Sequence, residues 1–151
     1  LEGFNTDYIG FENSLQPLLQ QQHTKALVLG NGGASKAVMY VLSKLGIAYE
    51  VVSRKLHDGS TLTYDSLTPE VVHSHPLIIN TTPLGTYPNV LERPLIPYDA
   101  VGANHLLYDL VYNPEQTQFM KEGAIRGAAT KNGYDMLVGQ AEAAWRIWNE
   151  V

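Results

Sequence analysis

The sequence predicts an α/β protein with a doubly wound parallel sheet of about six strands and helices on both faces. Short apolar runs recur along the chain without alternating with polar residues, which is typical of strands buried on both faces of a parallel sheet. Segments with helical spacing separate these runs, as in repeated strand–helix–strand units. A glycine-rich turn joins the first clear strand, residues 26–29, to the helix that follows it.

Length and composition limit the class of protein. The 151 residues suffice for one domain, which we expect to span residues 1–151. A hydrophobic content of 44% is ordinary for a globular protein, and the net charge of −5 argues against a nucleic-acid partner. We find no apolar run that could span a membrane and no signal peptide, so we expect a cytoplasmic protein without a membrane partner. The absence of cysteine excludes disulfides and zinc–thiolate sites, and we expect no metal site.

The amino-terminal half contains three expected strands. Thr6 can cap the first helix, with Asp7 in its first turn, and Pro17 should end or restart that helix. Gly46 can end the helix that follows the glycine turn. The elements expected here are a helix from residue 6, strands over 26–29, 49–53 and 61–64, a helix over 34–45 and a turn over 57–60.

The carboxyl-terminal half continues the alternation. Residues 87–104 are rich in proline and should form a loop. We expect helices over 65–73, from Asn113-Pro114 to Gly123, and from Asn132-Gly133 onward, with strands over 77–80, 106–112 and 126–131. One face of the last helix carries Leu137, Ala141, Ala144, Trp145 and Trp148.

The turn Gly30-Asn31-Gly32-Gly33-Ala34-Ser35 is the first candidate site. Glycines permit a sharp turn and a close approach of the backbone to a ligand, and the helix start behind them favours a phosphate. This is the arrangement of the dinucleotide fingerprint of Rossmann-like sheets, although Ser35 stands at the third glycine position. Taken alone, the turn fits a plain strand–helix connection equally well.

The end of the second strand favours NADP over NAD as the cofactor. Ser53, Arg54 and Lys55 stand where an NAD-binding protein carries an acidic ribose acceptor. The guanidinium of Arg54 can donate two parallel hydrogen bonds to a 2′-phosphate. Thr81 and Thr82 follow the strand 77–80 and can bond a ribose or pyrophosphate, or act as turn formers only.

Six motifs in this order resemble the carboxyl-terminal, NADP-binding domain of shikimate dehydrogenases. They are Asn5-Thr6-Asp7-x-x-Gly10, Gly30-x-Gly32-Gly33-Ala34, Ser53-Arg54-Lys55, Asn80-Thr81-Thr82-Pro83-Leu84-Gly85, Tyr108-Asp109-x-x-Tyr112 and Gly133-x-x-Met136-Leu137-x-x-Gln140-Ala141. The resemblance covers essentially the whole chain. It implies reversible hydride transfer between NADPH with 3-dehydroshikimate and NADP⁺ with shikimate, in the pathway to chorismate and the aromatic amino acids.

The resemblance also assigns roles to single residues. Asp7 matches the aspartate of a catalytic lysine–aspartate pair, and Tyr112 and Gln140 match residues that contact substrate. Leu110 and Gly133 match positions beside the nicotinamide. The family's lysine lies in an amino-terminal, substrate-binding domain that has no counterpart in this chain. We therefore expect the chain alone to bind cofactor without catalysing the reaction.

This sequence departs from the family pattern, and other assignments stay open. Asn31 and Thr81 each replace an alanine, Ser53 replaces an asparagine, and Asp135 stands where glycine is common. The alternatives are a quinate-type relative, a noncatalytic nucleotide-sensing module or another NADP-dependent Rossmann enzyme. The joint presence of Asp7 and Gln140 favours the shikimate-type enzyme. A homodimer remains an open alternative to a monomer.

Overall fold

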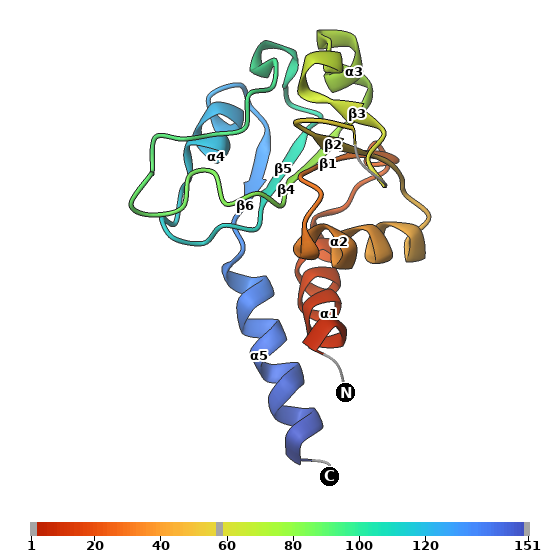
Figure 1. The fold of residues 1–151 in the computed structure, drawn as a ribbon, viewed down its shortest axis with the longest axis vertical. Helices are drawn as coiled ribbons and strands as arrows, with labels where there is room; N and C mark the ends of the chain where they lie inside the picture. The colour runs from red at the N-terminus through yellow and green to blue at the C-terminus, as the bar shows by residue number, and fades with distance from the viewer. Residues whose placement is uncertain (1–2, 57–58, 150–151) are drawn as a thin grey trace.

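The computed structural model describes the backbone of residues 3–56 and 59–149 and the side chains of residues 7–56 and 59–149. It contains a six-stranded sheet in the order β3-β2-β1-β4-β5-β6, and all five strand pairs are parallel. The strands are β1 (Lys25–Leu29), β2 (Ala48–Ser53), β3 (Leu62–Thr63), β4 (Leu77–Asn80), β5 (Leu106–Asp109) and β6 (Ala129–Lys131). The predicted α/β class with a doubly wound parallel sheet is confirmed (Figure 1).

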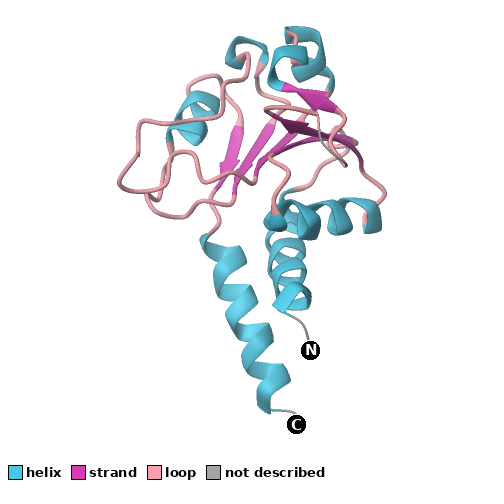
Figure 2. Cartoon of the chain, viewed as in Figure 1, coloured by secondary structure: helices cyan, strands magenta, loops and turns pink. Residues whose placement is uncertain are grey.

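Helices and short 3₁₀ turns connect the strands. They are α1 (Gly3–Leu15), η1 (Gln16–Leu18), α2 (Gly33–Lys44), η2 (Tyr64–Ser66), α3 (Pro69–Ser74), η3 (Tyr98–Ala100), α4 (Gln118–Ala124) and α5 (Tyr134–Asn149). Figure 2 shows that the long connection between β4 and β5 is almost entirely loop, as its proline content predicts. Among the helices that the structure describes, none is long and apolar enough to cross a membrane.

Both faces of the sheet are buried, because successive strand residues point into two different cores. Ala26 and Val28 of β1 face a core formed with α1, α2 and α5, which includes Phe11, Val38, Val41, Ile79, Tyr108 and Met136. Leu27 and Leu29 face a second core on the side of α3, η3 and α4, which includes Val52, Val72, Ile78, Tyr98, Leu107 and Phe119. This two-sided burial explains why the strands are continuous apolar runs.

The strand order places a switch point between β1 and β4. The chain moves outward from β1 to β2 and β3, then returns to begin β4 on the other side of β1. The connections that leave the carboxyl ends of β1 and β4 therefore run to opposite sides. In an open parallel sheet this divergence leaves a crevice where ligands bind.

Helices α1 and α5 lie side by side below the sheet (Figure 1). The amino-terminal end of α1 and the carboxyl-terminal end of α5 both point away from the sheet. A Cβ on Gly10 would lie 2.3 Å from the carbonyl oxygen of Met136, and one on Gly139 would lie 3.1 Å from Cα of Gly10. Only glycine allows the two backbones to approach this closely. The crossing of α1 and α5 is therefore fixed by these two residues.

Several predicted element boundaries are wrong. The first helix begins at Gly3, so Thr6 is not its cap and Asp7 does not lie in its first turn. The helix expected from Asn113-Pro114 begins instead at Gln118. Its cap is Thr117, whose hydroxyl accepts a hydrogen bond from the backbone N–H of Met120 at 3.2 Å.

Other boundaries shift by a few residues. The strand expected over 106–112 ends at Asp109, and the one expected over 126–131 begins at Ala129. The last helix begins at Tyr134, within two residues of the prediction. The turn expected over 57–60 lies partly outside the described residues, because residues 57 and 58 are not described.

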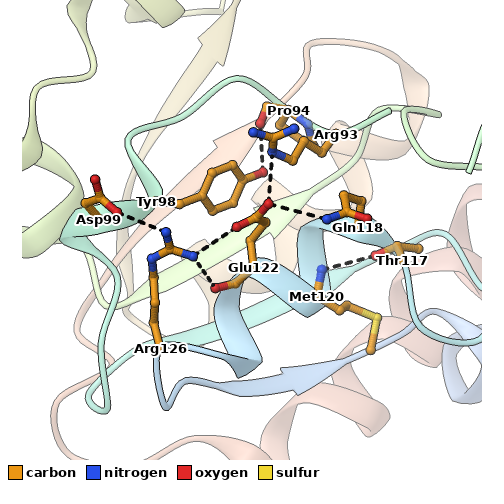
Figure 3. Close-up of polar contacts among 9 residues, drawn as sticks. All are labelled: Arg93, Pro94, Tyr98, Asp99, Thr117, Gln118, Met120, Glu122 and Arg126. Carbon is orange, nitrogen blue, oxygen red and sulfur yellow. Dashed lines mark hydrogen bonds and ion pairs between the residues drawn. The ribbon is translucent and has the colours of Figure 1, made fainter. Parts of the chain in front are cut away.

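An ion-pair cluster ties α4 to the long β4–β5 connection (Figure 3). The Arg126 guanidinium lies 2.9 Å from Asp99 Oδ1 and 2.9 Å from Glu122 Oε1. Arg93 Nε lies 3.5 Å from the second oxygen of Glu122, and Tyr98 donates its hydroxyl to the carbonyl of Pro94 at 2.7 Å. Asp99 is nearly fully exposed, so we expect its pair with Arg126 to contribute little stability. The cluster fixes the geometry of the loop that leads away from the switch point.

Candidate functional site

The glycine turn after β1 is shaped by a close contact with the end of β4. Gly30 has a φ of +111°, and a Cβ on it would lie 2.5 Å from Thr81 Oγ1. Thr81 itself is fixed at β1, because its hydroxyl donates to the carbonyl of Leu29 at 2.7 Å. Gly30 is therefore required by both its backbone conformation and the approach of the β4 loop.

Gly32 has a different role in the same turn. It is the N-cap of α2, it makes no side-chain capping bond, and a Cβ on it would meet no protein atom within 4 Å. Its φ of −96° is accessible to any residue, so the fold alone does not require glycine here. The start of α2 is thus open to a ligand that needs backbone N–H donors.

Ser35 explains the imperfect fingerprint. Its side chain is fully buried, and its hydroxyl donates to the carbonyl of Gly32 at 2.6 Å. The third fingerprint position requires a small residue, because the helix packs closely on the sheet there. A buried serine with a bonded hydroxyl meets this requirement.

A pocket of about 730 Å³ lies at the switch point. It is lined by Gly30, Asn31, Gly32, Ser53, Arg54, Tyr64, Thr81, Thr82, Pro83 and Leu84. Seven of these are residues that the sequence singled out as cofactor ligands. Gly33, Ala34, Lys55, Leu110 and Gly133, which the sequence also singled out, do not line it.

A second pocket of about 240 Å³ adjoins the first and shares Arg54, Tyr64 and Leu84 with it. Tyr64 is a residue that sequence reasoning missed. Burial raises the pKa of its hydroxyl, and the nearby Arg54 guanidinium partly opposes this rise. The signal that could have found Tyr64 is its position at the carboxyl end of the edge strand β3, next to Arg54 across the sheet edge.

A buried polar network lies behind the wall formed by Thr81 and Thr82. Asn80 and Asp109 occupy paired positions on β4 and β5, and both are fully buried. Asn80 Nδ2 donates to Asp109 Oδ1 at 3.1 Å, and Asn80 Oδ1 accepts from the backbone N–H and hydroxyl of Thr82 at 3.0 and 2.7 Å. Burial raises the pKa of Asp109 to about 6, although hydrogen bonds from Thr117, Val111 and Asn80 favour its charged form.

The predicted substrate-side residues Asp7 and Gln140 are in direct contact. Gln140 Nε2 donates to Asp7 Oδ1 across the α1–α5 crossing. Asp7 and Gly10 are three residues apart and so share a face of α1, which is why the close approach at Gly10 brings the two side chains together. Partial burial raises the pKa of Asp7. This pair does not line the switch-point pocket.

The remaining predicted residues lie beyond β5. Gly133 packs against Leu110 so closely that a Cβ on it would lie 1.9 Å from the Leu110 carbonyl oxygen. The backbone N–H of Gly133 also donates to the carbonyl of Val111 at 3.1 Å. Tyr112 is 47% exposed, so its ring is not buried in the core.

The face of α5 that includes Leu137 is exposed. Trp145 and Trp148 are 67% and 82% exposed, and Leu137 is 38% exposed. The residues of α5 that are buried in the fold are Met136 and Ala143.

The chain is similar in sequence to curated shikimate dehydrogenases. No protein-family model matches the chain. The curated shikimate dehydrogenase (NADP(+)) of Halothermothrix orenii is 36% identical over 173 residues, a match that covers 100% of this chain and 59% of that protein. The chain thus spans somewhat more than half the length of the curated relatives it matches.

Two solved structures illustrate the similarity in three dimensions. A chorismate mutase/shikimate 5-dehydrogenase fusion protein from Clostridium acetobutylicum is 37% identical with a TM-score of 0.81, over 97% of this chain and 55% of that one. A shikimate 5-dehydrogenase from Thermus thermophilus, in complex with NADP(H) and shikimate, is 27% identical with a TM-score of 0.82, over 97% of this chain and 57% of that one.

Proposed function

This chain belongs to the shikimate dehydrogenase family, and we propose that residues 1–151 form the NADP-binding domain of such an enzyme. The reaction is reversible hydride transfer between NADPH with 3-dehydroshikimate and NADP⁺ with shikimate, in the cytoplasmic pathway to chorismate and the aromatic amino acids. The observation that carries the proposal is the pocket at the β1–β4 switch point, which joins the start of α2 to Arg54 without interruption.

The residues of this pocket fit NADP at two points. The open start of α2, with glycine at Gly32 and no competing side chain, suits the pyrophosphate. The Arg54 guanidinium at the end of β2 suits the 2′-phosphate, and no carboxylate lines the larger pocket. When bound, NADP supplies the nicotinamide that donates or accepts the hydride.

Asp7 and Gln140 would act on the substrate side. The Asp7 carboxylate is held by Gln140 and by its place on a helix, so it can orient the lysine that the family carries in its other domain. Gln140 retains an amide oxygen that can accept from a substrate hydroxyl. Because the lysine belongs to a part of the enzyme outside this chain, the isolated chain should bind cofactor and not turn over shikimate.

Calorimetric titration with NADPH and NADH tests this proposal. We expect NADPH to bind more tightly, and Arg54→Ser to weaken NADPH by about tenfold or more, since one charge-assisted contact contributes roughly 1.5–3 kcal/mol. NADH affinity should change little. The matched control is Lys25→Ser, which removes the same charge from the first residue of β1, at the end of the strand opposite to the pocket. An NADPH preference that survives in Arg54→Ser would refute the assignment of Arg54.

A noncatalytic nucleotide-binding module is the alternative from another functional class. It would use the same pocket and would have no need of the Asp7–Gln140 contact. Binding of shikimate to the cofactor-loaded full-length protein, lost in Asp7→Asn and Gln140→Ala, would separate the two. Absence of shikimate binding to the full-length protein would favour the module.

A further inference from the structure

We propose that Asp109 is the positioning residue that sets the wall of the cofactor pocket on the β4–β5 side. Asp109 does not line the pocket, and it would act through Asn80 and through the backbone of Val111. The inference rests on the proposed function, because it concerns the part of NADP that lies beyond the reach of Arg54.

The first link runs from Asp109 through Asn80 to Thr82. The backbone N–H of Thr82 can only donate, so Asn80 must present its oxygen to Thr82 and its amide nitrogen to β5. The Asp109 carboxylate is the acceptor that satisfies this nitrogen in a fully buried place. Without it, the Asn80 amide nitrogen would keep only its longer bond of 3.4 Å to the carbonyl of Thr82, and the orientation that holds Thr82 would be less firmly fixed.

The second link runs from the same carboxylate oxygen to the chain that leaves β5. Asp109 Oδ1 also accepts from the backbone N–H of Val111 at 3.0 Å. This bond sets the direction of the segment that carries Leu110 and Tyr112, two residues with expected roles near the nicotinamide and the substrate. One oxygen atom thus fixes both the pocket wall at Thr82 and the segment next to it.

The third link runs away from the pocket. Asp109 Oδ2 accepts from the hydroxyl of Thr117 at 2.7 Å. Figure 3 shows that Thr117 in turn accepts from the backbone N–H of Met120 and so caps α4. Thr117 is fully buried and touches neither Thr82 nor Val111 through a hydrogen bond that the structure describes. Thr117→Val therefore breaks the network on the α4 side only and provides a matched control.

The proposed role needs an acceptor at the Oδ1 position and does not need a charge. Asp109→Asn can keep an oxygen facing Asn80 and Val111 and place its amide nitrogen toward Thr117 Oγ1. Asp109→Leu keeps the branched outline of the side chain, although leucine is larger, and removes the acceptor. The pair separates positioning through hydrogen bonds from an electrostatic effect of the carboxylate on the cofactor.

The test titrates each variant of this chain with NADPH and with adenosine 2′,5′-bisphosphate, which carries only the half of the cofactor that Arg54 would hold. We expect Asp109→Leu to weaken NADPH by about tenfold, comparable to one lost hydrogen bond to a charged group, and to change bisphosphate affinity less than about twofold. Asp109→Asn should restore NADPH affinity to within about threefold of the unsubstituted chain. Thr117→Val should lower the melting temperature and leave both affinities unchanged.

Three results would overturn the inference: equal loss of both ligands in Asp109→Leu, unchanged NADPH affinity in that variant, or loss of NADPH affinity in Thr117→Val. If Asp109→Leu does not fold, Asp109→Ser replaces it, since its hydroxyl can still accept from Val111 while releasing Asn80. The same loss of NADPH with intact bisphosphate binding is expected there. Failure of the unsubstituted chain to bind either ligand would instead refute the proposed function, so the two failures are distinguishable.

Discussion

Replacing Gly32 with valine should abolish cofactor binding and leave the fold intact. A Cβ at this position meets no protein atom within 4 Å, and the backbone has an extended conformation with φ −96° and ψ −165° that valine adopts readily. Valine is a less favourable N-cap than glycine, whereas the reduced flexibility of the unfolded chain favours folding, so the net change in stability should stay within about 1 kcal/mol. The new side chain would occupy the pocket that Gly32 lines.

The magnitude of the binding loss follows from what the start of α2 offers. Two backbone N–H groups that bond a pyrophosphate contribute about 1.5–3 kcal/mol each, because the acceptor is charged. Excluding the phosphate from both should cost at least about 3 kcal/mol, which is roughly a hundredfold or more in affinity. This exceeds the effect expected for Arg54→Ser, in which one contact is lost.

Calorimetry with NADPH measures the binding, and thermal unfolding measures the stability. The matched control is Gly102→Val, because a Cβ there also meets no protein atom within 4 Å and Gly102 lies outside the pocket. We expect Gly102→Val to bind NADPH normally. Retained NADPH affinity in Gly32→Val would mean that the turn is only a structural connection, and a large drop in its melting temperature would mean that Gly32 is required for folding.

Three further outcomes are expected. Burial raises the pKa of Asp109 to about 6, so between about pH 4 and 6 the folded state holds a proton that the unfolded chain releases. The free energy of unfolding should therefore fall by about 3 kcal/mol as the pH rises from about 4 to 6. The difference in unfolding free energy between the chain and Asp109→Asn, measured across this range, should isolate the contribution of Asp109. Gly10→Ala should destabilise by about 1–3 kcal/mol in thermal unfolding despite its better helix propensity, because its Cβ would lie 2.3 Å from the Met136 carbonyl. The isolated chain should give no measurable NADPH formation from shikimate, whereas fusion to the family's amino-terminal domain should give activity that Asp7→Asn reduces by about 10²–10⁴-fold; turnover by the chain alone would contradict this reasoning.

The strands could be predicted from sequence because their residues are buried on both faces. Leu27, Val28 and Leu29 form an uninterrupted apolar run for this reason. Because the glycines come directly after this run, the turn at the end of the strand could be predicted too. Ser35 reads as a defect in the fingerprint until its buried hydroxyl is seen to bond the turn. Side-chain size was the physical requirement there, and the motif records only residue identity.

Other features depend on pairings that a single sequence does not reveal. The contact between Asn80 and Asp109 depends on β4 and β5 being neighbours in matching register. Tyr64 was predicted only as the last residue of the strand 61–64. Its place beside Arg54 depends on the pairing of β3 with β2, which the sequence alone does not reveal. Likewise, helical spacing identified the face of α5 that carries Trp145 and Trp148, but the fold buries Met136 instead because α1 packs on the other side.

The glycine contact between α1 and α5 has a consequence for the order of folding. It joins the first and last helices of the described chain, and the Asp7–Gln140 bond closes a loop of 133 residues. Closing so long a loop has a large entropic cost unless the sheet has already brought the two ends together. We therefore expect α1 and α5 to dock last during folding. Their contact should also open first in the native protein, which hydrogen exchange of the backbone amides in these two helices would detect. In that partly open form the cofactor pocket would persist, whereas the hydrogen bond between Asp7 and Gln140 would be broken.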